Sequence, residues 1–359
     1  MRNPRLDDVA REAGVSPTTV SRVLNNRGYI SERTRERVFE AMTALNYTPN
    51  AVARSLRDSR SRLVGLIFPS VAHPFYGHMA KELEVRLSRE GYLVLLCNSD
   101  GQEATERAYL QMLLAHQVDG IITGAHSSVV ASTADLRAPL VTIDRETPGP
   151  HPNVRSANAA ASREVTRGLV ERGARRIVHL TSSRGGSQRA DGYREAMREA
   201  GLDERVVHVQ RLADWQESPE AVQQVLDACA VDGGVNAVVA SNDTLAMRAL
   251  GWARARGIRV PDELQVVGFD GALASRHLVP ELSTVIQPYA ELAETAAGLL
   301  TRAIAARRDS GPRPGPDDAT GADAPPSEAA PLVVECEARV HWGGTTRVVP
   351  PQDSDAAEG

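Results

Sequence analysis

Within the first quarter of the sequence, residues 6–57 have the most regular pattern in the chain. Its opening run, LDDVAREA, spaces apolar side chains as an amphipathic helix does and ends before Gly14, which takes a positive φ at no steric cost. Ser16 and Pro17 then supply the residue types of a helix N-cap and a first helical position. Two short helices joined by a glycine-containing turn, the second with a polar outer face, form a helix-turn-helix.

A third, longer helix follows, with Ser31 as its predicted N-cap and Pro49 beyond its end. The three helices would enclose a small apolar core of Leu6, Val9, Val15, Val20, Leu24, Ile30, Val38 and Leu45. The next segment, Ala51 to Leu56, can form one more helix, but it is too short to be stable alone in water. We therefore expect this segment to fold against a partner.

The runs DVAREAGVSPTTVSRVLN and TRERVFEAMTALNYTPNAVARSL resemble the lactose-repressor (LacI/GalR) family of bacterial transcription regulators. The resemblance covers residues 6–57 closely and the chain to about residue 305 more loosely. It implies that Ser16 to Asn25 is a recognition helix in the major groove and that Ala51 to Leu56 is a hinge helix. It also places Asn50, Ala53 and Leu56 at the DNA, with Leu56 as the apolar wedge between two base pairs.

The side chains of the second helix suit such a contact. Arg22 can make a bidentate contact to a guanine edge, and Pro17 and Thr18 offer apolar contact to a thymine methyl group. Residues suited to phosphate contacts, which set register, are Ser16, Thr19, Ser21, Asn25 and Tyr47. A helix-turn-helix spacing alone occurs in many helical proteins, and Leu56 alone could be a core leucine. The occurrence of these signals together, in this order, favours DNA binding.

The charge distribution agrees with a DNA-binding head on a separate body. Residues 1–60 contain eleven arginines and seven carboxylates, a net charge of +4, and since the whole chain carries −5 the remainder carries −9. This modest positive charge predicts weak binding by a single head and therefore a homodimer on double-stranded operator DNA. We expect a helix-turn-helix domain over 1–48, a hinge and linker over 49–61, and an effector-binding and dimerisation domain over 62–346.

From Leu63 onward, apolar runs of strand length alternate with helical patterns, as in LVGLIFP, YLVLLCNS, IVHLTS and LQVVGFD. This alternation predicts doubly wound parallel sheets, giving an α/β body of two lobes behind the all-α head. The resemblance implies a body similar to periplasmic sugar-binding proteins, in which the chain crosses between lobes three times. We place the crossings near Ser156, Gln287 and Pro331.

These crossings give an N-terminal lobe of about 62–156 and 288–308 and a C-terminal lobe of about 157–287 and 332–346. Residues 309–331 are rich in Pro, Gly, Ala and Asp, which predicts a disordered insertion, and 347–359 are expected to form a disordered tail. The last predicted strand, LVVECEARV, ends in HWGGTT, which fits the family's usual strand end poorly. No leucine heptad follows, so a dimer is favoured over a tetramer.

Polar and aromatic side chains follow several of the predicted strands, where a doubly wound sheet presents its ligand contacts. The candidates for effector binding are Ser70, Phe75, Tyr76, Asp144, Arg189, Trp215, Asn242 and Asp270. Carboxylates accept hydrogen bonds from hydroxyls, arginine and amide groups donate them, and an aromatic ring can cover the C–H face of a sugar. The set therefore suits a polyhydroxylated ligand.

The resemblance supports three of these positions. Arg189 lies three residues before a glycine, Asn242 begins an Asn-Asp pair, and Asp270 ends VVGFD, as effector-binding residues of the family do. Three of the candidates also have a purely structural alternative to effector binding. Asn242 could cap a helix, Asp270 could hold a turn and Trp215 could fill the core. Asp243 is predicted to be the N-cap of its helix.

Other classes of function fit less well. No G-x-S-x-G, H-E-x-x-H or paired-cysteine motif is present, so the sequence predicts no enzyme, cofactor or metal, although Asp144 and Asp270 could be imagined as a glycosidase pair. A periplasmic binding protein would need an export signal and would have no use for the head. Without an apolar leader or membrane-length segment, and with three scattered cysteines, a cytoplasmic location and no membrane partner are expected.

The sequence thus predicts a repressor that leaves its palindromic operator when a small-molecule effector, most simply a sugar, binds the body. A co-repressor-dependent regulator that binds a purine-like metabolite is the alternative.

Overall fold

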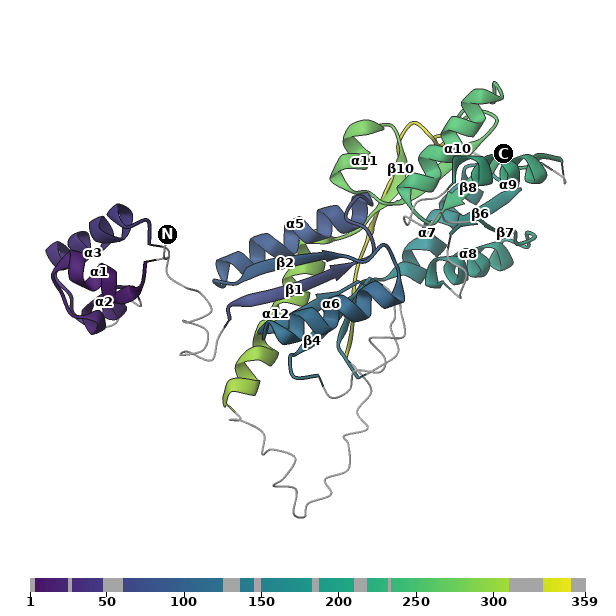
Figure 1. Cartoon of the computed structure of the whole chain (residues 1–359). Coiled ribbons are helices and arrows are strands. Elements are labelled where there is room, and N and C mark those ends of the chain that lie inside the picture. The colour runs from purple at the N-terminus through teal and green to yellow at the C-terminus, as the bar shows by residue number, and fades with distance from the viewer. Residues whose placement is uncertain are drawn as a thin grey trace, which may run out of the picture. The chain divides into compact units, whose positions relative to one another are not determined.

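The computed structural model describes residues 4–24, 28–47, 61–124, 136–144, 150–182, 187–209, 218–231, 234–309 and 332–349. The chain divides into two compact units, Met1–Ser61 and Arg62–Gly359, called here the head and the body (Figure 1). The predicted hinge segment, including Asn50, Ala53 and Leu56, lies outside the described residues, as do Asn25 and Trp215. Among the described helices, none has the length and apolar character needed to cross a membrane.

The head is a bundle of three helices, α1 (Leu6–Ala13), α2 (Pro17–Leu24) and α3 (Glu32–Ala44). Gly14 ends α1 in the left-handed conformation with φ 60°, as its place in the turn predicts. The head core contains Val9, Ala10, Ala13, Val20, Val23, Val38 and Ala41, with the other predicted apolar residues packed partly buried around them.

Two further interactions fix the turn that leads into α2. The Ser16 hydroxyl accepts a hydrogen bond from the Thr19 backbone N–H at 3.1 Å, so Ser16 caps α2 as predicted. The Arg37 guanidinium, reaching from α3, donates to the carbonyl oxygens of Ala13 and Gly14. A cation at these carbonyls complements the negative end of α1, so α3 holds the α1–α2 turn in place.

The N-terminal lobe of the body contains a six-stranded, wholly parallel sheet. Its strands are β1 (Leu63–Phe68), β2 (Leu93–Asn98), β3 (Gly120–Thr123), β4 (Leu140–Ile143), β5 (Asn153–Ser156) and β11 (Val333–Cys336), in the order β11-β5-β4-β3-β1-β2. Helices α5 (Pro74–Arg89) and α12 (Tyr289–Asp309) pack on one face, around Phe68, Leu83 and Leu300. Helix α6 (Glu103–Ala115) covers the other face through Leu113.

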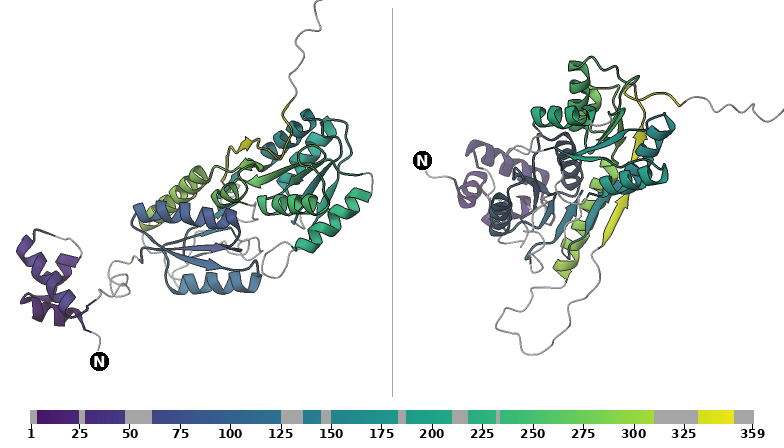
Figure 2. Two further views of the ribbon diagram at one scale, coloured as in Figure 1. Left: turned by 90° about the horizontal axis from the view of Figure 1, so that it is seen from above. Right: turned by 90° about the vertical axis from the view of Figure 1, so that its right-hand side faces the viewer.

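The C-terminal lobe repeats this plan. Its strands are β6 (Ile177–Thr181), β7 (Val206–His208), β8 (Ala237–Ala240), β9 (Gln265–Asp270), β10 (Ser283–Ile286) and β12 (Arg339–His341), in the order β12-β10-β9-β8-β6-β7, with only β12 antiparallel. Its helices are α7 (Asn158–Glu171), α8 (Gln188–Glu199), α9 (Pro219–Val231), α10 (Asp243–Ala255) and α11 (Leu273–Leu278). Helices lie on both faces of the sheets (Figure 2), as the doubly wound pattern predicts.

The chain crosses between the lobes three times, and the third crossing differs from the prediction. The first two follow Ser156 and Ile286, close to the expected positions. The run LVVECEARV, expected to be one strand of the C-terminal lobe, is two strands: β11 pairs with β5 of the N-terminal lobe, and only β12 pairs with β10. The third crossing therefore lies between Cys336 and Arg339 and not near Pro331, because the apolar run is long enough to serve both sheet edges.

The predicted start of the disordered tail at residue 347 is also wrong. The Arg347 backbone N–H donates to Gln265 Oε1 at 2.9 Å, and its guanidinium donates to the carbonyl oxygens of Pro261 and Asp262. Residue 347 is therefore fixed to the C-terminal lobe. Residues 350–359 and the predicted insertion, apart from Asp309 at the end of α12, lie outside the described residues.

A close contact between α7 and α8 generates a test of the body's packing. A Cβ added at Gly192 on α8 would lie 2.0 Å from the carbonyl oxygen of Ala159, so Gly192→Ala must separate the helices. We expect it to lower the free energy of unfolding by about 1–3 kcal/mol, measured by urea denaturation of the full chain. Gly251→Ala in α10 is the matched control, because no atom lies within 4 Å of its added Cβ. That variant should gain roughly 0.5–1 kcal/mol; equal effects of the two substitutions would contradict the packing argument.

Candidate functional site

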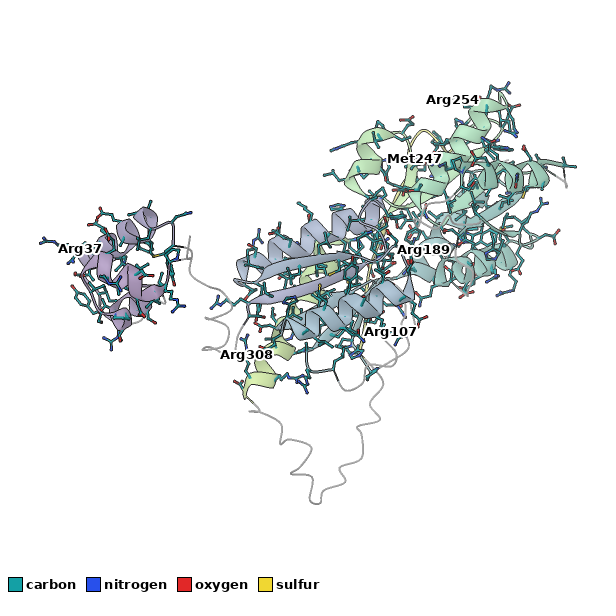
Figure 3. All side chains as sticks on the ribbon, in the orientation of Figure 1. Arg37, Arg107, Arg189, Met247, Arg254 and Arg308 are labelled. Atoms are coloured by element: carbon teal, nitrogen blue, oxygen red, sulfur yellow. The ribbon has the colours of Figure 1, made fainter. Side chains whose placement is uncertain are left out.

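Three of the predicted effector residues meet between the two lobes. Asp144 follows β4 of the N-terminal lobe, whereas Asp270 ends β9 and Arg189 begins α8 in the C-terminal lobe. Arg189 Nη2 lies 3.6 Å from Asp144 Oδ1, and Arg189 Nη1 lies 3.3 Å from Asp270 Oδ1. Figure 3 marks Arg189 where the lobes meet. The three side chains, which we call the interlobe triad, are only 14%, 10% and 4% exposed for Arg189, Asp144 and Asp270.

Arg189 is held in one orientation by groups of its own lobe. Its Nε donates to Asn158 Oδ1 at 2.7 Å, and its Nη1 donates to the Ser241 carbonyl at 2.5 Å. The guanidinium carbon also lies 3.7 Å above the ring of Phe269. These contacts leave the Nη2 side directed at the N-terminal lobe, which makes Arg189 a preorganised donor.

The N-terminal lobe contributes an aromatic wall. The Tyr76 hydroxyl donates to Asp144 Oδ2 at 3.1 Å, which places Tyr76 in the site. Phe75 lies edge-on to Tyr76, with ring centroids 4.9 Å apart, and also contacts the ring of Tyr289. Ser70 is buried at the end of the β1 segment. Phe75 thus supports the tyrosines from within the apolar core of the lobe.

Both carboxylates of the triad have a strained backbone. Asp144 has φ 74° and Asp270 has φ 118°, in the left-handed half of conformational space that residues with a Cβ rarely adopt. Such strain costs on the order of 1–3 kcal/mol and persists where the surroundings enforce it, often at binding sites. The strain supports a functional role for these two strand ends.

Ser156 and Gln287, which lie in the first two crossings between the lobes, are hydrogen-bonded to each other and to the triad. The sequence predicted these two residues only as the points where the chain crosses. Ser156 Oγ donates to Gln287 Oε1 at 2.7 Å, and Gln287 Nε2 donates to Asp270 Oδ1 at 2.7 Å. Both Ser156 and Gln287 are buried. Their only sequence signal is a polar residue inside each apolar crossing, which local spacing does not interpret.

Two more residues of the site were missed by the sequence. Asn158, which orients Arg189, gives only the signal of a polar residue directly after the first crossing. The Tyr289 hydroxyl is buried with no hydrogen-bond partner among the described residues. Burial and the negative charge of Asp270 raise the pKa of Tyr289 well above its usual value, so this phenol stays protonated and able to donate.

The Asn242–Asp243 pair differs from the prediction. Asn242, not Asp243, is the N-cap of α10, because its Oδ1 accepts from the Leu245 backbone N–H at 2.8 Å. Asp243 begins the helix and is buried, where its carboxylate accepts from the Gly271 N–H at 2.9 Å and from Thr284 Oγ1 at 2.6 Å. The two hydrogen bonds explain the placement: Asp243 secures the turn after Asp270.

Burial also sets the protonation of the acidic groups. Desolvation raises the pKa of Asp243 to about 6, although its hydrogen bonds oppose the shift. Desolvation raises the pKa of Asp270 well above its usual value, while the charge of Arg189 lowers it. Burial thus favours a proton on Asp243 and on Asp270, and Arg189 favours the ionised form of Asp270. Within the described part of the chain, no group of acidic, histidine and cysteine side chains is arranged to hold a metal ion.

The head presents the predicted DNA-contacting residues in one continuous stretch. Ser16, Pro17, Thr18 and Arg22 are exposed, and Thr19 and Ser21 are half-buried. The Ser16 and Thr19 hydroxyls lie 2.9 Å apart and are hydrogen-bonded to each other. A contact from either hydroxyl to DNA would therefore compete with this hydrogen bond at the start of α2. Tyr47 is half-buried against the head core, and Tyr29, which the sequence did not single out, is fully exposed.

Comparisons with known proteins agree for both units. Residues 5–50 match the family described as bacterial regulatory proteins, lacI family, and residues 166–317 match a periplasmic binding protein-like domain. The sucrose operon repressor of Pediococcus pentosaceus is 37% identical over 303 residues, 84% of this chain and 92% of that protein. The ribose operon repressor of Halalkalibacterium halodurans is 37% identical over 300 residues, 83% of this chain and 89% of that protein.

The solved structures show the same fold. A lac repressor dimer bound to operator and an anti-inducer has a TM-score of 0.77 at 24% identity, covering 97% of this chain and all of that chain. A helix-turn-helix head followed by a two-lobed body like that of periplasmic binding proteins defines a class of DNA-binding regulators. The chain belongs to the lacI family of bacterial regulatory proteins, and within it is a transcriptional repressor rather than an enzyme.

The buried Asp243 predicts a pH dependence of stability. Its pKa of about 6 in the folded body lies above the ordinary value of 3.8, so the folded state binds the proton more tightly than the unfolded chain. This contribution to stability is complete below pH 4 and is lost as the pH rises through 6. Relative to Asp243→Asn, the wild-type free energy of unfolding should fall by up to about 3 kcal/mol across that window. The exposed Asp203→Asn serves as control; a wild-type curve parallel to that of Asp243→Asn would contradict the assignment.

Proposed function

We propose that this repressor binds a twofold-symmetric operator as a homodimer and releases it when an uncharged, polyhydroxylated effector, a sugar, binds between the lobes of the body. The interlobe triad is the observation that carries the proposal. It places one preorganised donor and two acceptor carboxylates, contributed by both lobes, at a single buried point. A cytoplasmic location follows from the proposed action on DNA.

The charges of the triad favour a neutral ligand over an anionic one. One guanidinium and two carboxylates give a formal charge of −1 when both carboxylates are ionised, and of zero when Asp270 holds a proton. In neither state does a phosphate or carboxylate find a surplus positive charge, whereas sugar hydroxyls can donate to the carboxylates and accept from Arg189. The names of the sucrose and ribose operon repressors, the relatives described above, support a sugar.

The contact across the lobes offers a mechanism for the response. The 3.6 Å distance between Arg189 Nη2 and Asp144 Oδ1 is longer than a good charge-assisted hydrogen bond. A hydroxyl bridging the two would replace it with two short hydrogen bonds and draw the lobes into a new relative position. Through Gln287 and Ser156 this change reaches the first two of the three crossings. We expect a coupling of about 1–3 kcal/mol between effector and operator, equal in both directions.

Exposed apolar side chains support the homodimer. Leu93 and Leu96 are 69% and 49% exposed on β2, which forms the edge of its sheet, and Leu278 on α11 is 76% exposed. An exposed apolar edge strand is an unfavourable surface in water and favours burial against a second copy. Two copies would also double the positive charge that the heads offer to DNA.

The helix α2 assignment predicts a specific loss in an Arg22→Gln variant. If Arg22 contacts a guanine edge, affinity for the cognate operator should fall by roughly 1–3 kcal/mol, and discrimination should weaken at one base pair of each half-site. Gel-shift titration against operator and random DNA at one salt concentration measures both. Arg11→Gln on α1 is the matched control, since it removes the same charge from an exposed arginine of the head. An equal loss on random DNA would show that Arg22 binds phosphate instead.

The interlobe site predicts that Asp270→Asn separates the two activities. The variant keeps the shape of the side chain but loses the charge that faces Arg189, so it should bind operator normally and fail to respond to sugar. A panel of mono- and disaccharides titrated into the operator complex, followed by fluorescence anisotropy, gives the comparison with wild type. Retention of the full sugar response in Asp270→Asn would overturn the site, and tighter operator binding on adding ligand would favour the co-repressor alternative.

A further inference from the structure

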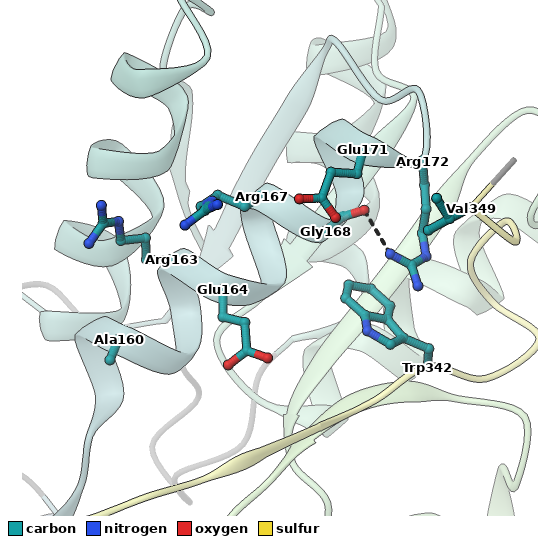
Figure 4. Close-up of a pocket in the computed structure, with 9 residues that line it drawn as sticks. All are labelled: Ala160, Arg163, Glu164, Arg167, Gly168, Glu171, Arg172, Trp342 and Val349. Carbon is teal, nitrogen blue, oxygen red and sulfur yellow. Dashed lines mark hydrogen bonds between the residues drawn. The ribbon is translucent and has the colours of Figure 1, made fainter. Parts of the chain in front are cut away.

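A groove of about 460 Å³ lies along helix α7 of the C-terminal lobe (Figure 4). One wall is helix α7 with the turn after it, and the other is formed by Trp342 and Val349 of the C-terminal segment. None of its lining residues belongs to the interlobe triad. Its volume lies within the range of small-molecule sites, roughly 300–1,000 Å³.

The HWGGTT segment, which the family resemblance does not explain, builds this groove. Thr345 anchors the segment, because its hydroxyl donates to the Val266 carbonyl at 2.6 Å and accepts from the Ser283 N–H at 2.9 Å. Trp342 rests on Gly168 of α7, where an added Cβ would lie 2.3 Å from the indole. The close approach of Trp342 to α7 thus requires a glycine at 168 and an anchored chain after Trp342.

Three arginine side chains line the groove, and they differ in their interaction partners. Arg163 is paired with Glu199 and Glu195 of α8. Arg172 lies 3.7 Å over the indole of Trp342, and its Nε is buried with no hydrogen-bond partner among the described residues. Burial lowers the pKa of Arg172, while the charge of Glu171 opposes the shift, and Arg172 Nη1 donates to the Gly168 carbonyl at 3.0 Å. Arg167 is exposed, and no ion pair or hydrogen bond joins it to another described residue.

We propose that this groove binds a small organic anion that carries a ring. A carboxylate or phosphate group pairs with the planar guanidinium of Arg167, which is suited to bidentate contacts with both. The ring lies beside Val349 and the part of the Trp342 indole that Gly168 and Arg172 leave uncovered, where these side chains offer apolar surface. Glu164 and Glu171 also line the groove and accept hydrogen bonds from donors on the ligand. The charge of Arg172, which also lines the groove, favours an anion there.

Calorimetric titration of the wild-type full chain tests the proposal, because the two carboxylates beside Arg189 leave no surplus positive charge for an anion in the interlobe site. The probes are phenyl phosphate and benzoate, with benzyl alcohol and inorganic phosphate as the uncharged and ringless comparisons. At least one ring anion should bind saturably, and more tightly than either comparison. Arg167→Gln should weaken this binding about tenfold, the loss expected for one charge-assisted contact.

Arg198→Gln is the matched control, because it removes an exposed arginine of the neighbouring helix α8 that does not line the groove. Binding should survive this change and should weaken in Trp342→Ala. The proposal is overturned if neither ring anion binds at millimolar concentration, if Arg167→Gln and Arg198→Gln weaken binding equally, or if inorganic phosphate or benzyl alcohol binds as tightly. The sugar response of the wild-type protein is measured separately, so failure here leaves the interlobe proposal intact.

Discussion

The rest of the body depends on one buried cation held between carboxylates of different lobes. Removing a guanidinium and two carboxylates from water costs several kcal/mol per ion unless they are paired. Arg189 is 14% exposed and can pair with Asp144 only while the lobes hold their present separation. The electrostatic energy of the triad therefore depends on the relative position of the two lobes. Any ligand that contacts the triad must change both.

The surroundings show how the fold supports this arrangement. Asn158 and the Ser241 carbonyl fix Arg189 from within its own lobe, so only the distance to Asp144 is left to vary. The positive φ angles of Asp144 and Asp270 show that the backbone accepts strain at both strand ends to place these carboxylates. The Ser156–Gln287 hydrogen bond then ties Asp270 to two of the three crossings. A change at the ligand contacts is transmitted to the hinge through hydrogen bonds instead of through loose packing.

Short sequence patterns predicted the features of this structure that depend on neighbouring residues in the chain. Capping and turn residues such as Gly14 and Ser16 specify the head, and apolar runs of strand length specify two parallel sheets. Strand ends also indicated Asp144, Arg189 and Asp270, because the topology of a parallel sheet places such residues at one edge. Local spacing could not show that Gln287 bonds to Ser156, 131 positions away. It also could not divide LVVECEARV between two sheets, since both strands alternate in the same way.

The two proposed ligand sites differ in the groups that they offer, and this difference gives each its own class of ligand. The interlobe triad has no surplus of positive charge and lies beside the crossings, so it suits neutral hydroxylated molecules and acts on the lobe angle. The groove beside α7 offers Arg167, which pairs with no described residue, next to the apolar side chains of Trp342 and Val349 in the same lobe. Binding there does not require the lobes to move. An anion in the groove would contact α7, whose first residue, Asn158, orients Arg189. One route of communication between the sites would therefore pass along this helix and end at the guanidinium on which the lobe contact depends.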